Sequence, residues 1–183
     1  MASDEELMAA AAATTDGGAS ALASLFERHR NNVYGFCFRL LGERSAAEDA
    51  VQDVFLRIYD RRHNYRVGAK FTPWMYTIAK NLCADRLKSA SRREVPMSQI
   101  EADCDDWKDE RVEDEAARSE LAGAVRDAVN ALPEDMRMVV ILREYQELDY
   151  REIATVMSCS EEAVRVRMHR ARQELRKRLG AFL

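Results

Sequence analysis

The cationic side chains with the most informative spacing lie near the end of the chain. An apolar segment, Tyr150–Met157, is followed by a short turn at 158–160 and by a segment at 161–172 that is rich in arginine. A helix, a tight turn and a second helix with an arginine-rich outer side form the pattern of a helix-turn-helix, whose second helix lies in the DNA major groove. The spacing therefore predicts an interface with duplex DNA.

The second of these helices has two chemically different sides. At about 100° per residue, one side collects apolar residues that we expect to pack on the preceding helices. An arginine on the opposite side can bind guanine O6 and N7, a valine can meet a thymine methyl, and flanking arginines suit phosphates. A solvated amphipathic helix is the alternative. The predicted DNA-binding residues are Arg165, Val166, His169, Arg170 and Arg172.

A second group of residues, in the helix predicted to end near Arg62, favours a protein partner. Asp49, Gln52 and Asp53 surround Leu56 on the side opposite the apolar positions of that helix. An exposed leucine among carboxylates, with Phe55 and Tyr59 at its edge, is typical of a docking patch. The alternative is that the two aromatic residues simply belong to the core.

A third group mixes cations, aromatic rings and amides in the loop 63–70 and the helix after it. Such mixtures bind single-stranded nucleic acid, because bases stack on rings while cations follow the phosphates. Trp74 has core spacing and is expected to be structural, and a solvated face is the alternative for the polar residues of the helix. The predicted single-strand-binding residues are Asn64, Tyr65, Arg66, Lys70, Lys80, Asn81 and Arg86.

Helices must position all three groups. Ser3 and Glu6 form a capping box for a first helix that the glycines at 17–18 end, and a second helix stops at Gly42. Ser45 is expected to cap a third helix, and a fourth spans about 71–90 with a proline in its first turn. Pro133 starts a helix that follows another at 121–132, and no segment has the alternation of a strand. We therefore expect an all-α chain with domains at 1–93 and 119–183, joined by an acidic flexible linker at 94–118.

Composition narrows the function classes. The 183 residues carry a net charge of -4, but the charges segregate into basic, acidic and basic stretches. The acidic start of the chain lacks the positive charge of a signal peptide, and no apolar run approaches a membrane span, so a cytoplasmic protein without membrane insertion is expected. Four dispersed cysteines indicate reduced thiols. We expect no metal or cofactor. We also expect the protein not to be an enzyme, because the sequence offers no nucleophile–base pair.

The order of these parts closely resembles a bacterial RNA polymerase sigma factor of the sigma-70 family, in its small extracytoplasmic-function (ECF) group. The resemblance covers about 22–179 and rests on the segments 46–59, 71–81, 132–137, 150–154 and 164–172. It implies a protein that directs transcription initiation by binding core RNA polymerase and promoter DNA. It also implies control by an anti-sigma factor.

The resemblance assigns roles to the three groups. It implies that the patch of Asp49, Gln52, Asp53 and Leu56 docks on the clamp helices of core polymerase. The loop with Lys80 and Asn81 would capture a flipped base of the non-template strand at the -10 element. Arg165, Val166, His169 and Arg170 would read the -35 element, and the acidic linker would run toward the polymerase active centre.

Two features depart from the family pattern. Ser158 stands where many relatives have a glycine in the turn, which costs some strain if its backbone is left-handed. Glu161 and Glu162 suit the dipole of the recognition helix but repel phosphate. A stand-alone helix-turn-helix regulator, which would bind its operator as a dimer without polymerase, remains the alternative function.

Overall fold

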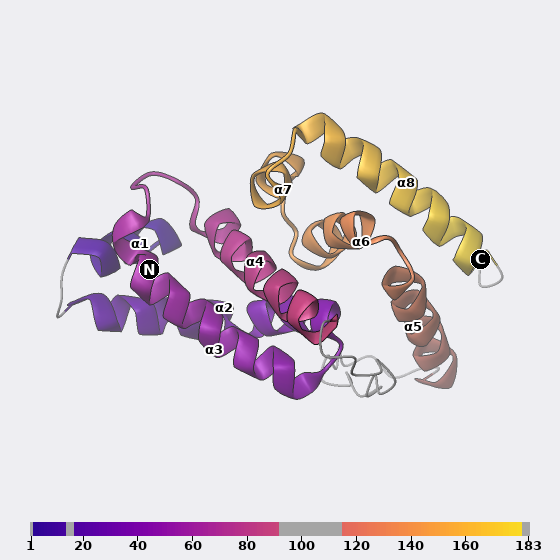
Figure 1. Cartoon of the computed structure of the whole chain (residues 1–183), viewed down its shortest axis with the longest axis horizontal. Helices are drawn as coiled ribbons and strands as arrows, with labels where there is room; N and C mark the ends of the chain where they lie inside the picture. Colours follow the sequence, from indigo (N-terminus) through magenta and orange to yellow (C-terminus); the bar gives the residue numbers. More distant parts are fainter. Residues whose placement is uncertain (1, 14–16, 92–114, 181–183) are drawn as a thin grey trace. The chain divides into compact units, whose positions relative to one another are not determined.

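The computed structural model describes residues 2–13, 17–91 and 115–180. Within these ranges the chain is helical and has no strand, which confirms the predicted all-α class (Figure 1). It divides into two compact units, one built on the helices before residue 92 and the other on the helices from residue 115 on, apart from 155–158. None of the described helices is long and apolar enough to cross a membrane.

The described residues before 92, in the first unit, form four α-helices and one short 3-10 turn. They are α1 (Asp4–Ala13), α2 (Gly17–Leu41), α3 (Arg44–Arg61), the 3-10 turn η1 (Arg62–Asn64) and α4 (Phe71–Ser91). The helix α2 packs on α1, α3 and α4. The centre of the unit is filled by large side chains that are fully or almost fully buried: Met8, Leu25, Phe36, Ile58, Phe71, Met75 and Tyr76.

The helix ends of this unit test the local sequence signals. The capping box is confirmed, since the Ser3 amide donates to Glu6 Oε2 at 2.8 Å and the Glu6 amide donates to Ser3 Oγ at 3.1 Å. Gly42 follows α2 with φ of 74°, as a helix-stopping glycine does. The expected cap by Ser45 is wrong: α3 begins at Arg44, and the Ser45 hydroxyl donates to Glu43 Oε1 at 2.6 Å.

Glycine also has a different role from the one predicted at the start of α2. Gly17 and Gly18 open α2 instead of ending the first helix, which already ends at Ala13. A Cβ at Gly18 would lie 3.0 Å from the Ala11 carbonyl oxygen. The missing side chain therefore lets α1 lie close against α2.

The first unit also buries two thiols, Cys37 on α2 and Cys83 on α4. They are hydrogen-bonded to each other, and this bond together with burial raises the pKa of Cys37. The thiol of Cys37 therefore remains protonated and packs as a small apolar group. Cys159 is free and partly buried.

The second unit contains α5 (Glu115–Asn130), α6 (Glu134–Val140) with the π-helical turn η2 (Ile141–Tyr145), α7 (Tyr150–Met157) and α8 (Glu161–Leu179). The helix α8 packs on α5 and α6. Because α5 begins at Glu115, helix replaces the last residues of the predicted linker. The rest of that predicted linker, 94–114, lies outside the described residues. The core of this unit is apolar: Val129, Leu132, Val139, Ile141, Leu142, Ile153, Val164 and Met168.

Candidate nucleic-acid and protein interfaces

The turn between α7 and α8 sets the direction of the arginine-rich helix. Ser158 has a φ of 53°, so its backbone is left-handed, the conformation anticipated as strained for a residue with a side chain. The turn is closed by the Cys159 amide, which donates to the Ala154 carbonyl at 3.0 Å. Ser160 then caps α8 by accepting a hydrogen bond from the Ala163 amide at 3.2 Å. This is the geometry of a helix-turn-helix.

Burial along α8 agrees with the two sides expected from the sequence. Val164, Met168 and Ala171 are buried against the unit, whereas Val166 is 40% exposed. All five predicted DNA-binding residues are exposed and lie on one helix: Arg165, Val166, His169, Arg170 and Arg172.

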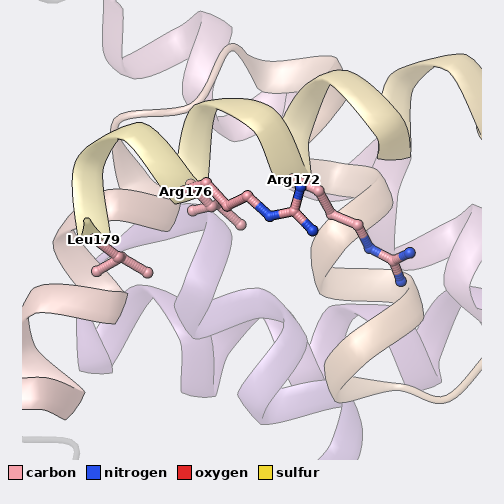
Figure 2. Close-up of a pocket in the computed structure, with 4 residues that line it drawn as sticks. Arg172, Arg176 and Leu179 are labelled. Carbon is pink, nitrogen blue, oxygen red and sulfur yellow. The ribbon is translucent and has the colours of Figure 1, made fainter. Parts of the chain in front are cut away.

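The last turns of α8 are less enclosed than the sequence pattern suggested. Leu175 and Leu179 are only half-buried and, with Arg172 and Arg176, line an open hollow along the helix (Figure 2). The guanidinium groups of Arg172 and Arg176 lie along this hollow, and Leu179 lies at its end. The hollow adds cationic surface beside the predicted DNA-binding face.

The cations of this face differ in their partners. The Arg165 guanidinium binds Glu161 Oε1 at 2.5 Å, which raises the pKa of Arg165, and it lies 5.5 Å from the centre of the Tyr150 ring. Arg172 binds Glu144 at 3.2 Å. Within the described part of the chain, the side chains of His169 and Arg170 make neither a hydrogen bond nor an ion pair. These two side chains are therefore the ones available without breaking an internal contact.

The residues of the predicted docking patch lie on α3. Leu56 is 61% exposed and Tyr59 is 49% exposed, and the Arg62 guanidinium lies 4.0 Å from the centre of the Tyr59 ring. Phe55 instead packs edge-on against Phe26, with ring centroids 4.9 Å apart. Phe55 is therefore half-buried against the neighbouring helix, while Tyr59 lies on the surface. Asp49 and Gln52 are exposed beside Leu56.

Asp53 and Arg86, predicted to serve different interfaces, lie together in the structure. Arg86 Nη2 binds Asp53 Oδ2 at 2.6 Å, and Arg86 Nη1 donates to the Ala46 carbonyl at 2.8 Å. These bonds connect α4 to α3. In this conformation Arg86 is a bridge between helices, which its position in a cationic segment did not indicate.

The loop before α4 presents some of its predicted residues and buries another. Asn64, Arg66 and Lys70 are exposed, as is Asn81 on α4, while Lys80 is half-buried. Tyr65, expected on the binding surface, is only 5% exposed, and its hydroxyl donates to the Ala69 carbonyl. Burial is the main cause of the raised pKa of Tyr65, followed by the nearby carboxylates Glu5 and Asp4. Tyr65 therefore shapes the loop from inside.

Trp74 supports that loop from the helix side. Its ring centroid lies 5.2 Å from that of Tyr65 and 6.2 Å from that of Phe71. This aromatic contact agrees with the structural role expected for Trp74. The exposed apolar residue of the loop is instead Val67, at 75%, which is not among the residues predicted from the sequence. An apolar residue inside an otherwise polar, non-periodic segment was the available signal.

Comparison with known proteins gives the same two-part division. The family described as Sigma-70 region 2 matches residues 25–93, and the family described as Sigma-70, region 4 matches residues 122–175. The first matched range covers most of α2 and all of α3 and α4, and the second covers most of α5 to α8.

Whole-chain similarity extends across both parts. The chain is 31% identical to the ECF RNA polymerase sigma factor SigW of Bacillus subtilis, over 89% of this chain and 91% of SigW. It is 32% identical to the RNA polymerase sigma-H factor of Pseudomonas aeruginosa, over 91% of this chain and 90% of that one. It is 30% identical to the ECF RNA polymerase sigma-E factor of Escherichia coli K12, over 87% and 86% of the two chains.

Two solved structures share the fold. CnrH, solved in complex with the cytosolic domain of CnrY, aligns with a TM-score of 0.72 and 24% identity over 97% of both chains. RpoE of Bartonella quintana, solved with the anti-sigma factor NepR, aligns with a TM-score of 0.71 and 21% identity, over 86% of this chain and 96% of RpoE.

Proposed function

Because the chain belongs to the sigma-70 family of RNA polymerase sigma factors, in its ECF group, we propose how its surfaces divide the work of promoter recognition. The first unit binds core polymerase and the opened -10 element, and the second unit reads the -35 element. The chain acts as an initiation factor and not as an enzyme, and it works in the cytoplasm, where polymerase and chromosome are found.

The observation that supports the -35 assignment best is the exposed face of α8. Arg170 and His169 have no internal partner among the described residues, and Val166 is exposed beside them. A forked guanidinium and an apolar contact on one helix are the chemistry of direct readout in the major groove. Arg165 and Arg172, which are held by carboxylates, suit phosphate contacts that fix the helix in register.

For the -10 element, the exposed members of the loop group provide the contacts. Amides and cations are offered to an unpaired strand by Asn64, Arg66, Lys70 and Asn81, which are exposed. The half-buried Lys80 supplies a further cation next to Asn81. Tyr65 contributes by holding the loop in shape, and Arg86 by joining α4 to α3. Val67 is an exposed apolar group that a base could contact.

Core polymerase docks on the α3 patch. Leu56 and Tyr59 supply exposed apolar surface, and Asp49, Gln52 and Asp53 supply polar and acidic groups around it. An apolar centre with a polar rim is the usual composition of a protein interface. The same apolar surface is the place where an anti-sigma factor would compete with polymerase.

Selection of DNA from a random duplex pool by the chain bound to core polymerase tests this function. The expected product has two sequence blocks at a fixed separation, and the chain co-purifies with core. The chain without core should select neither block efficiently. Strong selection of a single palindromic site by the chain alone would instead support a stand-alone regulator.

A further inference from the structure

The helix α1 lies before the residues matched by the region 2 family, yet it contacts both ends of the loop 63–70, here called the -10 loop after its proposed role. At one end, His63 Nδ1 lies 3.1 Å from the Ala12 carbonyl oxygen. At the other end, the Phe71 amide donates to Glu5 Oε1 at 3.2 Å. The loop 65–70 therefore runs between two anchors on the same short helix.

The contact at Phe71 replaces a missing helix cap. Lys70, which precedes α4, has no side-chain acceptor for the free amides of the first helical turn. Phe71 is fully buried, so its amide would lose water without gaining a partner. Glu5 supplies that partner and places a negative charge at the N-terminus of α4, where the helix dipole favours it.

The position of α1 is itself fixed by several contacts. Met8 and Ala11 are fully buried, and Asp4 binds Arg28 Nη1 at 2.9 Å and His29 Nε2 at 2.6 Å. The His29 ring lies 5.4 Å from the Phe71 ring. Glu5 is thus held beside the start of α4 by its own helix.

We propose that α1 fixes the -10 loop at both ends, and that Glu5 is a positioning residue for capture of the unpaired -10 strand. This inference rests on the proposed function of the loop. Glu5 touches no DNA; it acts by keeping Phe71 and the residues before it in one arrangement, so that Asn64, Arg66 and Lys70 meet the strand without first being ordered.

Point substitutions test this better than deletion of α1, because deletion would also remove Met8 and Ala11 from the core. Glu5→Ala removes the acceptor, Glu5→Gln keeps an acceptor oxygen, and Glu27→Ala removes an exposed carboxylate from α2 as the matched control. Hydrogen exchange at the Phe71 amide is measured in the free chain. Affinity is measured for the chain bound to core polymerase, with a single-stranded non-template oligonucleotide from a selected promoter as the probe.

Glu5→Ala should raise exchange at Phe71 about tenfold and weaken oligonucleotide binding by about the same factor, since a lost cap has this size of effect. Glu5→Gln should keep most of the protection at Phe71 and most of the oligonucleotide affinity. In both variants the affinity for core polymerase and for -35 duplex should stay unchanged. Wild-type oligonucleotide affinity in Glu5→Ala, or an equal loss in Glu5→Gln, would overturn the inference. If the wild-type complex itself does not bind the oligonucleotide, the proposed function of the loop fails as well.

Discussion

Individual cations on α8 are not equivalent, because their internal partners differ. Arg165 and Arg172 already bind carboxylates, whereas Arg170 has no such partner among the described residues. A guanidinium without an internal bond can turn toward a base at little cost. Sequence specificity should therefore depend more on Arg170 than on its charged neighbours.

Arg170→Ala should cost about 1–3 kcal/mol of binding free energy on the preferred -35 sequence and relax the preference at one base position. Competition binding by the polymerase complex against single-base variants of the element measures this. Arg178→Ala, an exposed arginine two turns further along α8, is the control. An equal loss on every -35 variant would mean that Arg170 contacts phosphate.

Leu56 offers the clearest test of the docking patch. Leu56→Ala should weaken binding to core polymerase about tenfold, as loss of a well-placed apolar anchor does. The free energy of unfolding should change by less than about 0.5 kcal/mol, since the side chain is exposed. Val67→Ala, which truncates the exposed loop residue, serves as the control in the same titration. Unchanged core affinity in Leu56→Ala would place the docking surface elsewhere.

The left-handed backbone of Ser158 predicts a stabilising substitution. Ser158→Gly should raise the free energy of unfolding by up to about 1 kcal/mol, because relief of left-handed strain exceeds the entropy cost of glycine. Ser158→Ala keeps a Cβ in the same conformation and should give no such gain. Urea unfolding of the wild type, Ser158→Gly and Ser158→Ala measures these differences. Equal stability of the glycine and alanine variants would exclude backbone strain at this position.

Among the helices, local signals were readable from sequence and distant contacts were not. The capping box at Ser3 and the stop at Gly42 involve neighbours in sequence, so they could be predicted. The cap on α4 comes from Glu5, 66 residues earlier, and the Asp53–Arg86 pair joins residues 33 apart. Such contacts depend on how helices pack. For this reason the sequence pattern places Arg86 among the DNA-binding residues, whereas in the structure its side chain connects α4 to α3.

The Arg86 bridge makes the pairing of α3 and α4 testable. Arg86→Ala should lower the free energy of unfolding by about 1 kcal/mol, a modest value because both partners are partly exposed and screened by solvent. Arg66→Ala, on the exposed loop, should leave stability unchanged. Chemical denaturation followed by circular dichroism measures both. Unchanged stability in Arg86→Ala, together with weaker -10 binding, would favour direct DNA contact instead.

At the scale of the whole chain, segregated charge explains an acidic DNA-binding protein. The net charge of -4 disfavours long residence on random duplex, while the basic surfaces of each unit provide local attraction. We therefore expect promoter binding to require both units acting together on polymerase. The acidic stretch that separates the basic ones falls mainly outside the described residues, and its path remains a prediction.

Random duplex should therefore bind the free chain weakly, with a dissociation constant no tighter than about a micromolar at physiological salt. Fluorescence anisotropy across a salt series measures this, and binding should fall steeply as salt rises. Nanomolar binding that resists salt would contradict the role assigned to the acidic charge.

We expect the two separate DNA contacts to work together only when core polymerase holds both units. Run-off transcription from a selected promoter tests it most directly, using core alone, core with the chain, and templates whose spacer is lengthened by about five base pairs, half a helical turn. Core with the chain should start at one position, core alone should not, and the lengthened spacer should abolish initiation. Equal initiation from both spacers would show that the two contacts are not coupled, and no initiation when the chain is added would refute its role as an initiation factor.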